Sequence, residues 1–209
     1  GEKLLGELAQ TVADSDSWKE APGVCYIDEN GEYRQNGGLQ RIRKVDEIPW
    51  PHWEEGYLEK FWDAGKSLGI LSERDMPFMF SRGCPFQCTF CSNATMWTTL
   101  YRLRDPDDVM AELKSYMERY DITGVQLYDL TAVVKKSWIV DFARRLVQEG
   151  IRLQWSLPNG TRSEALDEET LQALRDAGLE YIAYAPDSGS PTSLKKIKKK
   201  VNLDNLTES

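Results

Sequence analysis

From Met76 onward, short apolar runs alternate with helical repeats of apolar residues. Runs typical of buried strands lie at 77–81, 124–128, 152–156 and 181–185. Helical spacing begins at Asp105-Pro106 and at Ser190-Pro191, and it also covers 137–149 and 168–177. Strict alternation of strand and helix favours parallel βαβ units. Successive strand starts lie about 28 residues apart, which is the usual length of such a unit.

The pattern therefore predicts an α/β fold, namely the first half of a partial (β/α) TIM-type barrel. About four βα units fit into residues 76–209. In barrels of this kind, active sites lie on the loops that follow the carboxyl ends of the strands. We therefore look for chemistry in the segments after each predicted strand.

The pattern before Met76 is less regular. Residues 3–13 and 55–66 show helical spacing, and 23–28 with 32–35 form a predicted hairpin around Asn30-Gly31. Prolines in the stretch 46–53 cannot donate ladder hydrogen bonds, which indicates a linker. We expect a short α/β remnant over 1–45, a linker over 46–75 and an incomplete barrel over 76–209. The chain begins without Met, so we expect it to be part of a longer protein.

The composition narrows the class of protein only slightly. The 209 residues are 41% hydrophobic and 29% charged, as in ordinary soluble domains. The net charge of −8 disfavours a general nucleic-acid binder. No apolar run is long enough to cross a membrane, and no signal peptide opens the chain. We expect a cytoplasmic protein with neither nucleic acid nor membrane as partner.

Three of the four cysteines, Cys84, Cys88 and Cys91, share one short loop with the spacing CxxxCxxC. Three such thiolates can hold a [4Fe–4S] cluster and leave one iron open to a small molecule. The alternative is a zinc site completed by Cys25. Zinc prefers four ligands arranged in CxxC pairs, so the unequal triplet favours the cluster. Cys25 lies in an apolar alternating run and is predicted to be a buried strand thiol.

Two further features carry less weight. His52 is the only histidine, which excludes zinc or di-iron sites with several histidines. Because His52 lies beside two tryptophans and a proline, we interpret it as a packing or surface residue and expect no Ser/His/Asp triad. Five lysines between 195 and 200 could indicate a phosphate or nucleic-acid patch. Lysines in the last turns of a helix favour its dipole without any partner, so we interpret this run as a solvated helix end.

The cysteine spacing, with Phe90 directly before the last cysteine, resembles the signature of the radical S-adenosylmethionine (SAM) superfamily. The stretch 185–191, Ala-Pro-Asp-Ser-Gly-Ser-Pro, resembles a segment after the fourth strand in the members that carry a cobalamin-binding domain. Residues 128–131 and 159–162 resemble the segments after the second and third strands of that subgroup. Residues 1–3 and 46–49 resemble the end of its cobalamin domain and its linker.

The resemblance implies a role for eight residues. Cys84, Cys88 and Cys91 would hold the cluster, and Phe90 would pack against the adenine of SAM. The implied further SAM contacts are Asp129, Arg162, Asp187 and Ser188. The alternatives are purely structural roles. Asp129 would cap a helix or turn, Arg162 would form a surface ion pair, and Asp187 and Ser188 would cap the last helix.

The resemblance also implies a function. The protein would cleave SAM reductively and start radical chemistry, either methyl transfer or ring cyclisation, on a small-molecule substrate. It would need a reducing partner such as flavodoxin or ferredoxin. Cobalamin would belong to the full-length protein and would not be ligated by this chain. The alternative from another class is a non-catalytic metal-binding module that carries zinc or an electron-transfer iron–sulfur cluster.

Overall fold

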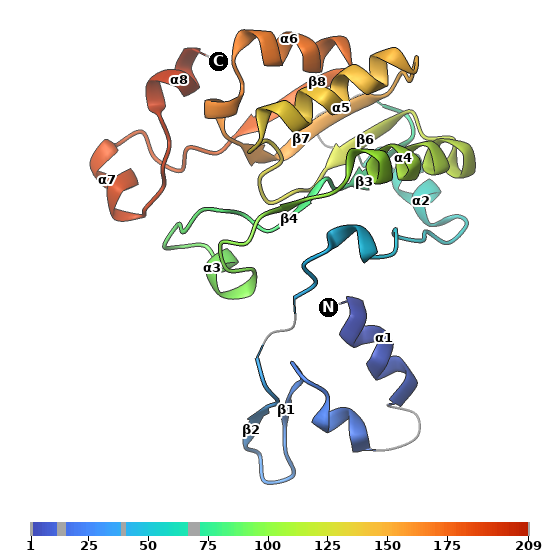
Figure 1. The fold of residues 1–209 in the computed structure, drawn as a ribbon, viewed down its shortest axis with the longest axis vertical. Helices are drawn as coiled ribbons and strands as arrows, with labels where there is room; N and C mark the ends of the chain where they lie inside the picture. Colours follow the sequence, from blue (N-terminus) through green and yellow to red (C-terminus); the bar gives the residue numbers. More distant parts are fainter. Residues whose placement is uncertain (1, 12–15, 39–40, 67–71, 209) are drawn as a thin grey trace. The chain divides into compact units, whose positions relative to one another are not determined.

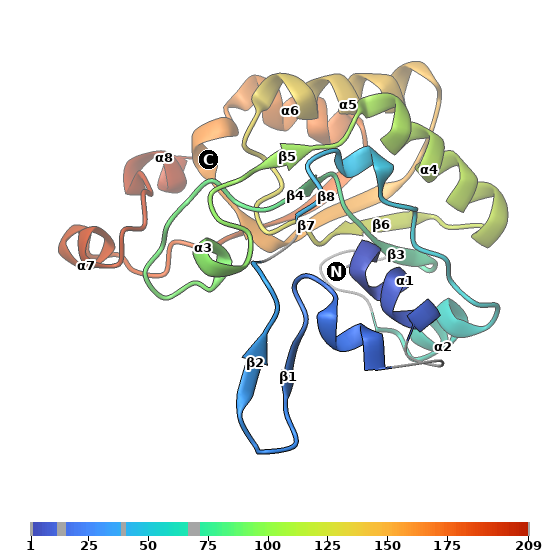
Figure 2. The ribbon, with the colours of Figure 1, turned by 60° about the horizontal axis from the view of Figure 1, so that its bottom comes forward.

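The computed structural model describes residues 2–11, 16–38, 41–66 and 72–208. The chain divides into two compact units, Gly1–Ile48 and Pro49–Ser209. Figures 1 and 2 show the ribbon from two directions. The assignment of 1–45 to a cobalamin-domain remnant and of 46–75 to a linker stays a prediction.

The first unit contains two short helices, a hairpin and a helical turn. Its elements are α1 (Glu2–Thr11), the 3-10 helix η1 (Asp16–Glu20), β1 (Cys25–Ile27), β2 (Tyr33–Gln35) and the 3-10 helix η2 (Val45–Glu47). The predicted helix over 3–13 is therefore present as α1, and its last two positions lie outside the described residues. The predicted hairpin is also present, with β1 antiparallel to β2.

The prediction that Cys25 is buried is wrong. Cys25 lies in β1 as expected, but its side chain is exposed and accepts a hydrogen bond from the Tyr33 hydroxyl at 3.2 Å. The residues of β2 are all exposed, and those of β1 are exposed or half-buried. An apolar alternating run implies burial only where another layer covers one face of the strand.

The second unit is built on four parallel strands. The order in the sheet is β3 (Asp75–Phe78), β6 (Gly124–Leu127), β7 (Gln154–Thr161) and β8 (Leu179–Tyr184). The connecting helices are α4 (Pro106–Tyr120), α5 (Lys136–Gln148) and α6 (Glu168–Asp176). These helices lie together on one face of the sheet (Figures 1 and 2). The expected α/β fold with four βα units is confirmed.

Shorter elements complete this unit. They are α2 (Tyr57–Asp63), β4 (Ser81–Arg82), α3 (Asn93–Met96), β5 (Arg102–Leu103), the 3-10 helix η3 (Ser163–Ala165), α7 (Pro191–Lys196) and α8 (Leu203–Glu208). The start of α4 follows the prediction: the Asp105 side chain accepts a hydrogen bond from the Asp107 backbone at 2.8 Å, and Pro106 takes the first helical position.

All four parallel strands differ from their predicted ranges, and β3 and β7 differ most. β3 spans 75–78 instead of 77–81, and Ser81–Arg82 pairs with β5 in a separate antiparallel ribbon. Pro77 fits inside β3 because this strand pairs on one side only, with β6. β7 continues to Thr161 instead of ending at 156, with irregular register against β8 between Leu157 and Thr161.

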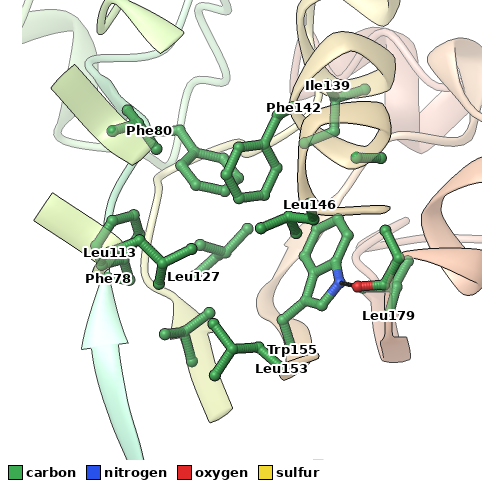
Figure 3. Close-up of a cluster of buried hydrophobic side chains, with 14 of the residues drawn as sticks. Phe78, Phe80, Leu113, Leu127, Ile139, Phe142, Leu146, Leu153, Trp155 and Leu179 are labelled. Carbon is green, nitrogen blue, oxygen red and sulfur yellow. Dashed lines mark hydrogen bonds between the residues drawn. The ribbon is translucent and has the colours of Figure 1, made fainter. Parts of the chain in front are cut away.

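The core lies between the sheet and its helices, and aromatic rings fill its centre (Figure 3). The Phe142 ring of α5 lies 4.6 Å from the Phe80 ring and 5.9 Å from the Trp155 ring, centroid to centroid. The Trp155 indole donates a hydrogen bond to the Ala177 carbonyl at 2.9 Å. This core fixes the strand ends from which the candidate site is built.

Candidate functional site

The cysteine loop connects β4 to β5, the two strands of the antiparallel ribbon. Ser81 pairs with Leu103 and Arg82 with Arg102, which fixes the base of the loop on both sides. Gly83 follows with a φ of +84°, and a Cβ atom there would lie 2.0 Å from the Leu100 carbonyl oxygen. Only glycine fits this close approach of two backbone segments. The first cysteine of the loop, Cys84, is therefore held at a fixed starting point.

Asn93 ties the far end of the loop to its start. This side chain is buried, and its amide group donates to the Cys84 carbonyl at 2.9 Å, the Thr98 carbonyl at 3.1 Å and the Phe86 carbonyl at 3.4 Å. The Asn93 backbone donates to the Cys91 sulfur at 3.5 Å. Asn93 is not predicted from the sequence, because nothing in its immediate sequence distinguishes it from a residue that caps the following helix.

The three thiols are free and differ in exposure. Cys84 and Cys88 are half-buried, and Cys91 is exposed. Burial raises the pKa of the Cys84 thiol, and the nearby Arg162 guanidinium partly opposes this rise. Within the described residues, no three His, Cys, Asp or Glu side chains stand where they could hold one metal ion together. The donor set itself, three thiols on a braced loop, fits a cluster with one iron free of protein ligands.

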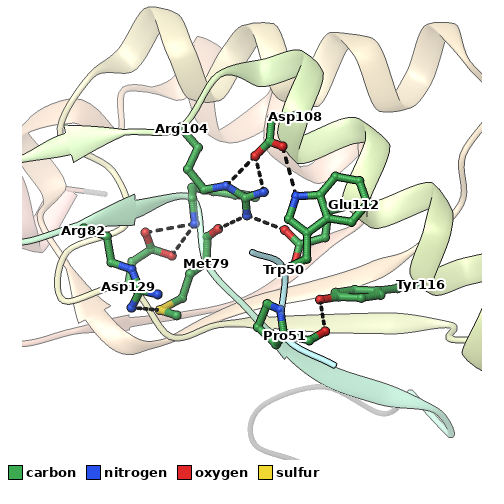
Figure 4. A network of polar contacts seen from close by, with 10 residues as sticks. Trp50, Pro51, Met79, Arg82, Arg104, Asp108, Glu112, Tyr116 and Asp129 are labelled. Carbon is green, nitrogen blue, oxygen red and sulfur yellow. Dashed lines mark hydrogen bonds and ion pairs between the residues drawn. The ribbon is translucent and has the colours of Figure 1, made fainter. Parts of the chain in front are cut away.

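Two separate contacts hold the residues that enter the loop (Figure 4). The Asp129 carboxylate, at the end of β6, accepts hydrogen bonds from the Phe80 backbone at 3.1 Å and from the Ser81 hydroxyl. The Arg104 guanidinium donates to the Met79 carbonyl at 3.0 Å.

Acidic residues of α4 in turn bind the Arg104 side chain. Its guanidinium forms ion pairs with Asp108 at 2.5 Å and with the buried Glu112. The Trp50 indole donates to Asp108 at 3.0 Å. A charged network therefore fixes the backbone just before the cysteine loop to the helix layer.

Asp129 is fully buried, and burial raises its pKa above the ordinary value. Its bonds from Ser81 and Phe80 act in the opposite direction, because both favour the charged carboxylate. Both carboxylate oxygens are engaged by these donors. Asp129 thus connects the second parallel strand to the entry of the cysteine loop. A contact of this residue with SAM stays a prediction.

Arg162 lies against the middle of the loop. Its guanidinium carbon is 3.5 Å from the centre of the Phe86 ring, and Phe86 lies between Cys84 and Cys88. Arg162 also faces Glu164 at 3.8 Å, and only 11% of its side chain is exposed. The ion pair expected for Arg162 is therefore present, but it is largely buried and lies against the cysteine loop instead of on the surface.

Asp187 and Ser188 form the turn that leads into α7. Asp187 has a φ of +63° and forms an ion pair with Lys199 at 2.5 Å. The Ser188 hydroxyl accepts a hydrogen bond from the Ser190 backbone at 3.1 Å, and Ser190 in turn caps α7. Their contacts with SAM stay predictions, as does the contact of Phe90, whose ring is 59% exposed beside Cys91.

The segment after β8 also reaches the cysteine loop. The Thr89 backbone donates to the Ile197 carbonyl at 2.9 Å, just beyond the end of α7. A cavity of about 930 Å³ lies between this segment and the loop, with Phe86 and Arg162 in its wall. None of the described helices is long and apolar enough to span a bilayer.

Comparison with known proteins places the site in a family context. The family model described as the Radical SAM superfamily matches residues 78–209. A methyltransferase of Pyrococcus horikoshii, itself uncharacterized, is 29% identical over 199 residues, which is 95% of this chain and 41% of that protein. The cytidylyl-2-hydroxyethylphosphonate methyltransferase of Streptomyces wedmorensis is 31% identical over 171 residues, 79% of this chain and 31% of that protein.

Solved structures share the fold. The radical SAM methyltransferase TsrM from Kitasatospora setae superimposes with a TM-score of 0.75 at 17% identity, over 100% of this chain and 41% of that one. The cobalamin-dependent SAM radical enzyme OxsB gives 0.74 at 19% identity, over 98% of this chain and 29% of that one. The chain therefore spans less than half the length of these relatives. The predicted resemblance to the radical SAM superfamily is confirmed.

Proposed function

Because the chain belongs to the radical SAM superfamily, we propose that it carries the cluster-binding and SAM-cleaving part of a radical methyltransferase or cyclase. The observation that carries this proposal is the cysteine loop itself. Three thiols stand on a loop that glycine, Asn93 and the β4–β5 ribbon brace, beside the carboxyl end of a parallel sheet. Enzymes built on such sheets carry their chemistry at this edge.

Each residue has a stated task in this proposal. Cys84, Cys88 and Cys91 hold the cluster as thiolates, and Arg162 balances part of the negative charge that gathers there. When bound and reduced, the cluster supplies the electron that cleaves SAM to methionine and a 5′-deoxyadenosyl radical. Phe90 offers an exposed ring and its backbone to the adenine.

The remaining SAM contacts follow from charge. The amino group of SAM needs acceptors, which the carbonyl groups of residues 128–131 offer where Asp129 anchors them to the loop. The carboxylate of SAM needs a cation, for which we propose Arg162, since its guanidinium lies against Phe86 of the cysteine loop. Asp187 and Ser188 complete the set from the turn after β8. Asp187 would have to exchange its partner Lys199 for the ligand.

The reaction and its partners belong to the complete protein. Relatives with printed activities include the methyltransferase of Streptomyces wedmorensis and an anaerobic magnesium-protoporphyrin IX monomethyl ester cyclase of Rubrivivax gelatinosus. We propose methyl transfer or ring cyclisation on a small molecule, with flavodoxin or ferredoxin as reductant, in the cytoplasm. We extend the proposal to cobalamin because OxsB is cobalamin-dependent; no residue of this chain is proposed as its ligand.

Anaerobic reconstitution tests this function. The protein should take up iron and sulfide in the proportions of a [4Fe–4S] cluster and show broad visible absorbance. With SAM and a strong reductant it should then release 5′-deoxyadenosine or S-adenosylhomocysteine. Stoichiometric zinc without iron would instead identify a metal-binding module without catalysis.

The ligand assignment has its own test. Replacing Cys88 by Ala should reduce the iron content to background, because two thiolates hold a cubane cluster poorly. Cys25→Ala is the matched control, since the Cys25 thiol is exposed on the hairpin and bonded to Tyr33. Iron content is measured after reconstitution and desalting. Iron that survives Cys88→Ala would remove this residue from the ligand set.

A further inference from the structure

The lysine run at 195–200 is attached to the cysteine loop. The run begins in the last turn of α7, which ends at Lys196, and continues through Lys200. Between its lysines, Ile197 accepts the hydrogen bond from the Thr89 backbone. From the sequence, this run is expected to be a solvated helix end with no partner. The structure adds a neighbour that is 108 residues away in the sequence and lies between two of the predicted cluster ligands.

A cleft of about 530 Å³ lies between the run and the loop. On one side it is lined by Pro85, Phe86 and Gln87, which are the residues that separate Cys84 from Cys88. On the other side it is lined by Lys195, Lys198, Lys199 and Lys200. Thr99 and Leu194 complete the wall, and the described lining residues include no carboxylate.

The lysines of this cleft differ in their partners. Lys199 is largely covered and forms an ion pair with Asp187. Lys195, Lys198 and Lys200 are exposed, and none of them forms an ion pair with another residue in the part of the chain that the structure describes. We call these three residues together with Pro85, Phe86 and Gln87 the lysine face. Its cationic groups are available to a partner and remain in contact with water.

The surrounding charge makes this face distinctive. The chain as a whole carries a net charge of −8, so an acidic partner is repelled by most of it. A local cationic area can orient such a partner and raise its association rate, because charge complementarity acts mainly on encounter. Exposed ammonium groups suit a broad, hydrated interface better than a dry pocket for a small anion.

We propose that the lysine face is the docking surface for a small acidic one-electron carrier protein, which reduces the cluster. This inference rests on the proposed function. The carrier gives up one electron and the cluster accepts it, so no bond forms or breaks and no proton moves. The face is suited to this task because its loop residues lie between two cluster ligands. Redox encounters of this kind use small interfaces that are sensitive to salt.

The test compares two variants of equal charge in the complete protein. In the first, Lys195, Lys198 and Lys200 are all replaced by Glu. In the second, the matched control, the exposed Lys60, Arg144 and Arg152 are replaced by Glu; they lie on α2, on α5 and just before β7. Calorimetry measures the affinity of each for an acidic flavodoxin at low ionic strength, with and without the cluster. SAM cleavage is then driven in parallel by reduced flavodoxin and by dithionite.

We expect the lysine variant to bind flavodoxin at least about tenfold more weakly and to lose its salt dependence, because the charge pairs that steer association are gone. Its flavodoxin-driven cleavage should fall in proportion, and its dithionite-driven cleavage should match that of the unsubstituted protein. The control variant should lose about twofold or less of its affinity for flavodoxin, since its substituted residues lie outside the lysine face. Lys198→Gly should show a smaller loss of the same kind, and it keeps the backbone, because Lys198 has a φ of +54° that suits glycine.

Three results would overturn the docking surface. The first is an equal loss of flavodoxin affinity in both triple variants, and the second is an unchanged affinity in the lysine variant. The third is displacement of flavodoxin by inorganic phosphate at constant ionic strength. A lack of any SAM cleavage by the unsubstituted protein with dithionite would count against the proposed function instead. The affinity of the cluster-free protein for flavodoxin would still test whether the lysine face binds this partner.

Discussion

At the scale of single residues, the cysteine loop depends on a few positions whose surroundings are closely constrained. Gly83 has a positive φ, and the Leu100 carbonyl oxygen occupies the space of a side chain there. Asn93 satisfies three carbonyl groups of the loop with one amide. Such contacts order the backbone of the loop before any metal arrives, which lowers the ordering cost of binding.

Gly83→Ala should therefore damage the loop. The substitution combines backbone strain of about 1–2 kcal/mol with a clash that requires the loop to move. We expect a lower free energy of unfolding and reduced iron uptake. Gly150→Ala is the matched control, since Gly150 has a φ of +67° but open space around it. Denaturant unfolding measures the free energy of unfolding of both variants, and iron analysis measures their iron uptake. Equal values for the two variants would contradict a destabilising clash at Gly83.

At the scale of elements, the parallel units follow the helical and strand periods of the sequence, and caps set the helix starts. Asp167 begins α6: its carboxylate accepts hydrogen bonds from the Thr170 backbone at 3.0 Å and from the Lys136 ammonium of α5 at 2.6 Å. These donors hold the pKa of Asp167 well below its ordinary value. One residue thus joins two neighbouring helices.

Asp167→Ala should lower the free energy of unfolding, because the cap of α6 and the contact with Lys136 are lost. Because the folded pKa is depressed, the contribution of Asp167 is complete above the ordinary carboxyl pKa of about 3.9 and is lost as pH falls below it. Asp167→Asn is the control, since Asn caps as well but cannot titrate. Unfolding curves between neutral pH and acid should show a shallower acid loss in the Asn variant; identical acid slopes would contradict this role.

At the scale of the whole molecule, one aromatic centre joins the sheet to its helix layer. Phe142 from α5 contacts Phe80 before the cysteine loop and Trp155 on β7 (Figure 3). Its side chain is almost fully buried. The packing that stabilises the second unit is therefore the same packing that supports the strand ends of the site.

Phe142→Ala should destabilise the second unit by about 3–5 kcal/mol, because it removes a large buried ring from a packed core. Val147→Ala on the same helix is the control, since Val147 is 54% exposed and should cost less than about 1 kcal/mol. Denaturant unfolding followed by tryptophan fluorescence and circular dichroism measures both. A loss below about 1 kcal/mol for Phe142→Ala would mean that the core repacks around the gap.

The sequence alone determined the order of strands and helices, the parallel sheet and the spacing of the three cysteines. Periodicity and covalent spacing are local properties, so they can be read without the fold. Boundaries were less certain, because Asp75 and Met76 at the start of β3 and Thr161 at the end of β7 join their strands through pairing with neighbours. The exposure of Cys25 likewise depends on the absence of a covering layer over its hairpin in the described residues.

Which distant residues meet at the loop depends on how the chain packs. Asp129 reaches Phe80 across 49 residues, Arg162 covers Phe86, and Ile197 bonds to Thr89. Contacts of this range leave no periodic trace in a single sequence, because chain packing, not spacing along the chain, brings the groups together. For that reason the lysine run looked like a solvated helix end in the sequence and became part of the cysteine loop's surroundings in the structure.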